Sequence, residues 1–279
     1  MRTIIVIILI PILFILTGCT GTGVNQEDLP APAQASFSQT ISLPDPIPES
    51  AFSLEESLKA RRSVREYSQI PLRLEEVSQL LWSAQGITAD FGGRTAPSAG
   101  ALYPLEVYLA AGNVEKLSPG VYIYKPRGHE IELLKNQDVR EELSGAAVGQ
   151  LSVRNGAVSI VISAVYERTT IKYGDRGVRY VHIETGHAAQ NVCLQATSLN
   201  LGAVTIGAFN DKQVKDILGM PENEDPLYII PVGKSEITKL QETITRKISN
   251  LKIQNSKVGV KYLTSSYAPI NILPIPGII

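Results

Sequence analysis

The segment that most constrains the fold is residues 158–165, VSIVISAV, in which nearly every side chain is apolar or small. A strand of this composition is typical of a sheet that is covered on both faces, since a strand with one wet face alternates apolar and polar residues. The rest of the chain must therefore supply structure on both sides of this strand, which favours a layered domain.

Two further segments show the apolar spacing of helices. One stripe recurs at spacings of 3, 4 and 3 and is followed by Gly86 as a stop: Leu74, Val77, Leu81 and Ala84. A second stripe runs from Ala189 to Ala196, and we expect its helix to end at Gly202. A shorter helix is predicted over 54–60.

Strands are predicted between these helices. Apolar and polar residues alternate over 105–109, which is typical of a strand. A hairpin is predicted from 121–124 and 130–133, which flank the turn Pro126-Arg127-Gly128. Residues 203–206 and 227–232 have the apolar composition of buried strands. Helices and strands alternate without a strict repeat. We therefore predict a three-layer α+β domain over residues 51–236.

Composition and failed motifs exclude several classes of protein. The chain has 26 basic and 27 acidic residues, which argues against a nucleic-acid-binding protein, and two cysteines are too few for a disulfide scaffold or a zinc ribbon. His182 and His187 lie on different faces of a helix, so we expect no metal site. Gly233-Lys234-Ser235 resembles the end of a phosphate-binding loop, but Tyr228 stands where that loop requires glycine. A nucleophile elbow requires glycine two positions before its serine, and Ser98 has Ala96 there.

The N-terminus reads as an export signal. Residues 4–16 are a 13-residue apolar run that leads into Leu16-Thr17-Gly18-Cys19, which resembles a bacterial lipoprotein signal with Cys19 as the lipidated residue. An uncleaved single-span anchor is the alternative, and both place the rest of the chain outside the cytoplasmic membrane. We expect a signal peptide at 1–18 and a proline-rich tether at 19–50.

The C-terminal part, residues 237–279, differs from the domain before it. A narrow apolar stripe at spacings of 3, 4, 4 and 3 predicts a helix that packs on something: Ile237, Leu240, Ile244, Ile248 and Leu251. It either covers its own domain or grips a second subunit. A proline-containing tail follows.

Two segments suggest a bound anionic, flat ligand. Arg61, Arg62, Ser63 and Arg65 fall within five residues, where a phosphate can accept their hydrogen bonds. A solvated basic turn paired with Glu55 and Glu56 is the alternative. The segment 96–104, APSAGALYP, has small residues that let the backbone approach a flat ligand, although an ordinary tight loop would look the same.

In this order, five segments together resemble the nitroreductase superfamily of flavin enzymes, and most closely its SagB-type dehydrogenase branch. The matching stretches are RRSVREY at 61–67, PSAGALYPLEVYL at 97–109, PGVYIY at 119–124, KYGDRGVRYVHIETGHAAQNVCLQA at 172–196 and LGAVTIGAF at 201–209.

The resemblance implies a central mixed sheet flanked by helices, with FMN at the interface of a homodimer. Arg61, Arg62, Ser63 and Arg65 would hold the FMN phosphate and ribityl chain. Ser98, Ala99 and Gly100 would lie along the isoalloxazine ring, and Ile206, Gly207 and Ala208 would present backbone N–H groups to its edge.

The resemblance also implies a reaction. A Lys-Tyr pair is implicated in proton removal in the SagB-type branch, and Lys172 and Tyr173 fall at that position, with a solvated loop as the alternative. We expect an FMN-dependent oxidoreductase, anchored in the cell envelope, acting on a small organic substrate. The alternatives are an azoline-to-azole dehydrogenase of peptide maturation and a non-catalytic flavin-binding envelope lipoprotein.

Overall fold

The computed structural model describes residues 39–235. The predicted signal peptide with Cys19, the first part of the tether and the predicted C-terminal helix and tail lie outside the described residues. Within residues 39–235, no helix is both long enough and apolar enough to cross a bilayer.

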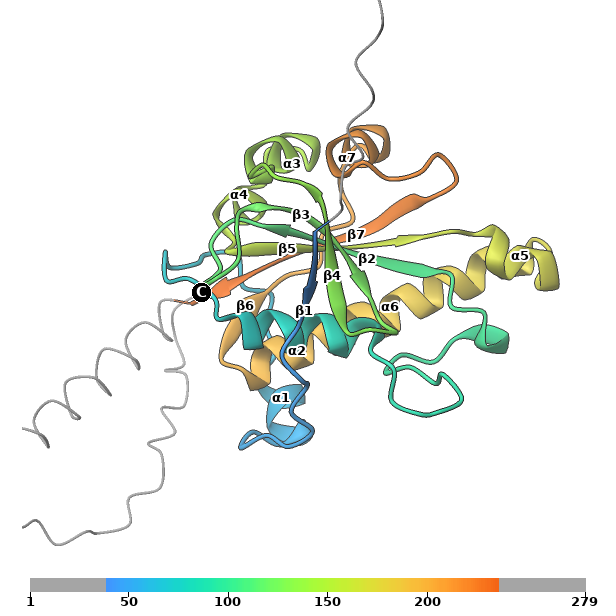
Figure 1. Ribbon diagram of the computed structural model, residues 1–279, viewed down its shortest axis with the longest axis horizontal. Helices are drawn as coiled ribbons and strands as arrows, with labels where there is room; N and C mark the ends of the chain where they lie inside the picture. The colour runs from blue at the N-terminus through green and yellow to red at the C-terminus, as the bar shows by residue number, and fades with distance from the viewer. Residues whose placement is uncertain (1–38, 236–279) are drawn as a thin grey trace, which may run out of the picture. The chain divides into compact units, whose positions relative to one another are not determined.

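A seven-stranded sheet in the order β1-β4-β3-β2-β5-β7-β6 forms the middle of the fold (Figure 1). Its strands are β1 (Thr40–Ser42), β2 (Leu105–Ala111), β3 (Gly120–Lys125), β4 (Glu130–Lys135), β5 (Val158–Ala164), β6 (Leu201–Ala203) and β7 (Asp225–Lys234). All seven residues of β5 are buried, as its composition predicted.

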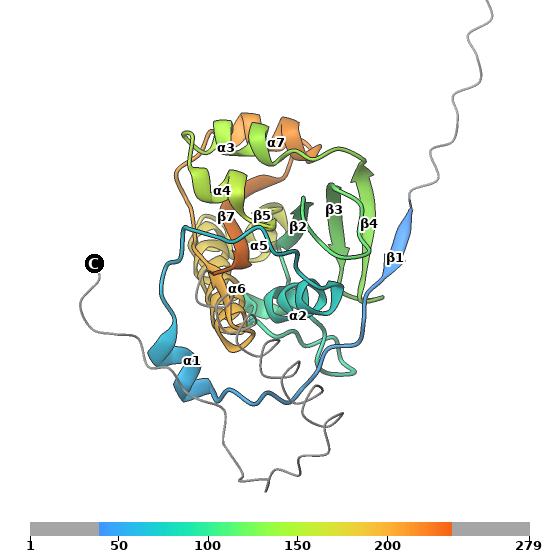
Figure 2. The same cartoon turned by 90° about the vertical axis from the view of Figure 1, so that its left-hand side faces the viewer.

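Helices cover both faces of this sheet, which confirms the three-layer α+β prediction (Figure 2). On one side lie α3 (Arg140–Ala146), α4 (Leu151–Asn155) and α7 (Asp211–Leu218), and on the other α2 (Leu74–Gln85) and α6 (Arg176–Ser198). The short helices α1 (Leu54–Ala60) and α5 (Glu167–Tyr173) and a 3₁₀ turn (Ala99–Ala101) complete the set in the described chain. Each face has its own apolar core, with Leu80, Val192 and Ile160 in one and Leu143, Val214 and Val161 in the other.

The expectation of a mixed sheet needs a correction. Every pairing between the strands named above is antiparallel. Parallel pairing occurs in the described residues only as isolated bridges, Ser63 with Ala203 and Leu72 with Val114.

The expected tether is also wrong over its last part, residues 39–50. Thr40–Ser42 pairs with β4 at the edge of the sheet, and Leu43 is buried in the core. The Ile47 N–H donates to Gln79 Oε1 at 2.9 Å, and Gln79 Nε2 donates back to the Ile47 carbonyl at 3.1 Å. Tertiary contacts therefore fix a segment whose composition alone looks unstructured.

Helix α6 is longer at its start and shorter at its end than its apolar stripe predicted. It begins at Arg176, and the apolar pattern did not reveal this start because the polar residues Glu184 and Thr185 occupy buried positions. It ends at Ser198 rather than at Gly202, which lies in β6. There a Cβ would come within 2.5 Å of Val64, so this glycine permits close packing and does not stop the helix.

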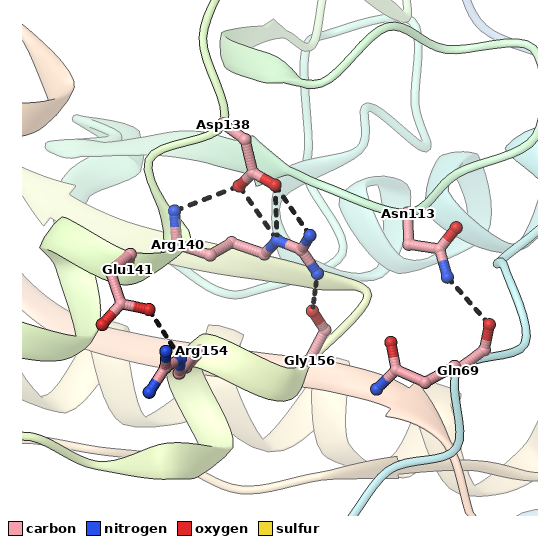
Figure 3. A network of polar contacts seen from close by, with 7 residues as sticks. All are labelled: Gln69, Asn113, Asp138, Arg140, Glu141, Arg154 and Gly156. Atoms are coloured by element: carbon pink, nitrogen blue, oxygen red, sulfur yellow. Dashed lines mark hydrogen bonds and ion pairs between the residues drawn. The ribbon is translucent and has the colours of Figure 1, made fainter.

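A polar network at the start of α3 joins that helix to α4 and to the strand ends; we call it the α3–α4 corner (Figure 3). Asp138 accepts hydrogen bonds from Arg140 Nε at 2.9 Å and Nη2 at 2.7 Å, and Arg140 Nη1 donates to the Gly156 carbonyl at 2.8 Å. Arg154 pairs with Glu141 at 2.5 Å. Every guanidinium of this corner thus has a carboxylate partner.

Candidate active site

The arginine turn, residues 61–65, follows directly from α1. That helix begins with a capping box in which Ser53 Oγ accepts from Glu56 N and Glu56 Oε2 accepts from Ser53 N at 2.8 Å. Glu56 is therefore engaged in the cap. Within residues 39–235, the guanidinium groups of Arg61 and Arg65 have no hydrogen bond or ion pair, so neither is paired with Glu55 or Glu56. Arg62, Ser63 and Arg65 are exposed to solvent, as the alternative of a solvated basic turn expects.

Arg62 behaves differently from its two neighbours. Its Nη1 donates to the carbonyls of Lys59 at 3.0 Å and Arg61 at 2.7 Å. These bonds satisfy carbonyls at the C-terminus of α1, where a cation is also favoured by the helix dipole. Part of its hydrogen-bonding capacity is thus used to close the helix.

The turn is fixed against the sheet and against α6. Val64 N donates to the Ala203 carbonyl at 3.0 Å, and Tyr67 Oη donates to the carbonyls of Val64 at 2.7 Å and Pro231 at 3.0 Å. Burial raises the pKa of the Cys193 thiol in α6, and the nearby charge of Arg61 opposes that rise. The charge of Arg61 therefore reaches the Cys193 turn of α6.

The Ser98 loop, residues 96–104, has a constrained backbone. Ser98 Oγ accepts from Tyr103 N at 2.9 Å, and φ is positive at Gly100 (65°), Ala101 (55°) and Tyr103 (46°). Such values are uncommon for residues with a side chain, so the surroundings must hold the loop in place. Arg94 helps to do so, since its guanidinium lies 4.4 Å from the centre of the Tyr103 ring.

The predicted proton-transfer pair lies directly against this loop. A Cβ on Gly100 would fall 2.7 Å from Tyr173 Oη, closer than real Cβ atoms approach, and 3.0 Å from Lys172 Nζ, which is a tight contact. Both residues belong to the last turn of α5, and Tyr173 packs edge-on against Tyr180 with ring centres 5.1 Å apart. The pair lies at the end of a helix, where Tyr173 is partly buried and Lys172 is exposed to solvent, as in the alternative of a solvated segment.

Glu184 is a site residue that the sequence motifs did not point to. It is 3% exposed in α6, and its Oε1 has no hydrogen-bond partner among the described residues. Burial raises the pKa of this carboxyl to about 7, against the lowering effects of the Ser98 hydroxyl and Arg94. Val181 and Ala188, on the same face of α6, are also buried, so extending the apolar stripe toward the start of the helix would have placed an acidic residue among buried positions.

The three residues expected at the edge of the flavin ring, Ile206, Gly207 and Ala208, divide into two groups. The Ile206 N–H donates to the Ile229 carbonyl at 2.8 Å and its side chain is buried, so Ile206 cannot offer that N–H to a ligand. Gly207 and Ala208 are exposed, and their N–H groups have no acceptor in the described part of the chain. Of the three residues, only Gly207 and Ala208 therefore have N–H groups open to an outside acceptor.

Within one chain, the arginine turn and the Ser98 loop influence the ionisation of different turns of α6. The charge of Arg61 acts on the pKa of Cys193 and the Ser98 hydroxyl on that of Glu184, and these two helix positions are nine residues apart, or about 14 Å along the axis. No cluster of three potential metal ligands among His, Cys, Asp and Glu occurs in residues 39–235.

The sequence and the fold are similar to those of known proteins. The family model described as Nitroreductase family matches residues 58–234. A Methanocaldococcus jannaschii protein named as a nitroreductase is 48% identical over 194 residues, covering 70% of this chain and 96% of its own. The microcin B17-processing protein McbC of Escherichia coli is 31% identical over 136 residues, which cover 46% of this chain and 49% of McbC.

A solved structure shows the same fold. A Ralstonia eutropha protein, also titled as a nitroreductase, superimposes with a TM-score of 0.63 at 31% identity, covering 74% of this chain and 94% of that one. The chain thus spans nearly all of two of these relatives and about half of McbC.

Proposed function

The chain belongs to the nitroreductase family, and from this premise we propose that it is an FMN-dependent oxidoreductase acting on a small organic substrate. The observation that carries the proposal is the contact of the Ser98 loop with Lys172 and Tyr173 at Gly100. It places two groups capable of proton transfer beside the backbone that the family resemblance assigns to the flavin ring.

The residues present fit FMN in their chemistry. Arg61 and Arg65 offer guanidinium groups that no described residue neutralises, and such groups bind phosphate through paired hydrogen bonds. Gly207 and Ala208 offer N–H donors of the kind that stabilise an anionic ring. Ser63, Ala99 and the free part of Arg62 complete the proposed contacts.

When bound, FMN supplies the two-electron redox chemistry, while the protein provides orientation, electrostatics and access. In our proposal Lys172 Nζ or Tyr173 Oη accepts the proton when the substrate is oxidised and donates it when the substrate is reduced. Arg94 and Ser98 keep the loop in its strained conformation, so that the pair meets a fixed surface.

We further propose that the working unit is a homodimer. The family resemblance implies a site shared between two chains, and the arginine turn and the Ser98 loop influence separate turns of α6, so in our proposal each chain contributes one of them. A second candidate reaction is azoline-to-azole dehydrogenation, which the similarity to McbC and the Lys172–Tyr173 pair favour. An envelope location argues against it, because that maturation runs beside an ATP-dependent partner in the cytoplasm.

The envelope location stays a proposal that rests on residues 1–19. We propose that Cys19 carries a lipid that anchors the enzyme at the outer face of the cytoplasmic membrane, with a quinone as one electron partner to test. Metabolic labelling with a fatty acid should mark the wild-type chain and fail to mark Cys19→Ser. Equal labelling of both chains would contradict the proposal that Cys19 carries the lipid.

The test of the flavin proposal is the visible absorption spectrum of the purified protein before and after a reductant. A flavin spectrum that bleaches on reduction supports the proposal, and a colourless protein that takes up no FMN overturns it. Steady-state turnover with a quinone or nitroaromatic acceptor then separates an enzyme from a flavin-binding lipoprotein without activity. Tyr173→Phe and Lys172→Met should lower that turnover while FMN stays bound.

A further inference from the structure

A cavity of about 440 Å³ lies between residues 47–57, which we call the strap, and helices α2 and α6. Its apolar wall includes Ile47, Phe52, Leu54, Trp82 and Leu194. Ile47 and Leu54 are 64% and 60% exposed, so the described residues leave this apolar surface largely uncovered. None of the residues assigned to the flavin site lines it.

The walls of this cavity are tied together. Gln79 of α2 exchanges hydrogen bonds with the backbone of Ile47 in the strap, and its Nε2 also donates to Gln195 Oε1 of α6 at 3.2 Å. One side chain thus joins all three elements. The hydrogen bonds of Gln79 therefore hold the strap, α2 and α6 together around the cavity.

The described chain ends beside this cavity. Ser68 N donates to the Lys234 carbonyl at 2.7 Å, and Lys234 Nζ lies 4.0 Å from Glu76 Oε1, which belongs to the cavity wall. Each further residue extends the chain by up to about 3.5 Å, so the three residues from Lys234 to Ile237 can span about 10 Å.

The next segment has the complementary pattern. Residues 237–251 carry the apolar stripe described above, with three basic residues and one acidic residue among them, a net charge of +2. The cavity rim carries Glu49 and Glu75, while its basic residue Arg73 already pairs with Glu76 at 3.2 Å. Apolar area and opposite charge therefore match on the two sides.

We propose that residues 237–251 dock in the cavity of their own chain and bury the stripe against the strap, α2 and α6. Docking would cover Ile47, Leu54 and Trp82 and tie the strap to the rest of the domain. This inference does not depend on the flavin assignment, since it involves none of the flavin-site residues.

Trp82 makes the proposal directly measurable, because it is the single tryptophan of the 279-residue sequence and it lines the cavity. Acrylamide quenching of the intrinsic fluorescence should be weak in the full chain. Ile244→Asp combined with Ile248→Asp should increase the quenching constant several-fold and shift the emission to the red. Thr238→Asp combined with Ser249→Asp adds the same charge to the opposite side of the predicted helix and should change neither.

Two results would overturn the docking. One is equal quenching in the full chain, in the Ile244/Ile248 variant and in a chain ending at residue 236. The other is shielding of Trp82 that disappears on dilution together with dissociation of a dimer, because a second copy would then be the occupant. Shielding that persists in the diluted monomer supports docking within one chain.

Discussion

The α3–α4 corner and the arginine turn use the same side chain in opposite ways. At the corner, Arg140 is held by both oxygens of Asp138 and by the Gly156 carbonyl, and Arg154 pairs with Glu141. At the turn, Arg61 and Arg65 have no partner within the described residues. A guanidinium whose donors are satisfied by the fold serves stability, whereas one left open on a fixed backbone is available to a ligand.

The carboxyl groups beside these two regions also differ, in the direction of their pKa shifts. Hydrogen bonds from Arg140 hold the pKa of Asp138 below its usual range. Burial beside the Ser98 loop raises the pKa of Glu184 to about 7. The corner therefore stabilises its charges, while the candidate site retains a buried acid at a cost in stability, as functional sites commonly do.

The largest expected effect is on FMN affinity, when the open guanidinium groups of the arginine turn are removed. Arg61→Ala combined with Arg65→Ala should weaken FMN binding at least about 100-fold, because each lost charge-assisted contact contributes roughly 1.5 to 3 kcal/mol. The free energy of unfolding of the flavin-free protein should hardly change. Flavin fluorescence titration and urea denaturation measure the two quantities.

Arg154→Ala is the matched control for that experiment. It removes a guanidinium from the corner and should leave FMN binding as it is. If the double variant instead lowers the free energy of unfolding while its folded form binds FMN with unchanged affinity, then Arg61 and Arg65 serve stability and the contrast with the α3–α4 corner is wrong.

The next largest effect concerns pH and Glu184. Its pKa is higher in the folded state than the ordinary value of 4.5, so the folded protein binds more protons and stability falls as pH rises from about 4.5 to 7. The full difference is on the order of 3 kcal/mol. Glu184→Gln should remove this decline, which urea unfolding at several pH values would record; a decline that persists in the variant would show that Glu184 does not cause it.

The sequence predicted those parts of the fold that are specified locally. The buried run of β5 and the stripe of α2 are periodic, and both lie where expected. Strand β1 could not be predicted, because three residues form it only by pairing with β4. The start of α6 was missed because Glu184 and Thr185 interrupt its apolar stripe.

The candidate site was predictable as a set of residues and not as an arrangement. The family motifs named Gly100, Lys172 and Tyr173, but their contact depends on where α5 ends relative to a loop some 70 positions earlier in the chain. The motifs also grouped Arg61 with Arg62, whose side chain closes α1. Only the tertiary structure separates an open guanidinium from a satisfied one.

A moderate effect is expected from Arg140→Ala at the corner. The unpaired Asp138 and the lost bond to Gly156 should lower the free energy of unfolding by about 2 kcal/mol at pH 7, with partial exposure of both side chains limiting the loss. Because the folded-state pKa of Asp138 is lowered, its share of the stability is lost as pH falls below about 3.8. The wild type and the variant should thus converge in acid, and a gap that stays constant with pH would exclude the ion pair as its cause.

The smallest effect distinguishes two glycines that face charged side chains. A Cβ on Gly112 would overlap the guanidinium of Arg140, so Gly112→Ala should displace that flexible group and lower stability by about 1 kcal/mol, with turnover intact. Gly100→Ala places its Cβ against Tyr173 and Lys172 at a positive φ, which costs a similar roughly 1 kcal/mol, but it should also reduce turnover with bound FMN. Equal losses of stability with unequal losses of activity would mark Gly100 as part of the site, and equal losses of both would reduce it to another tight glycine.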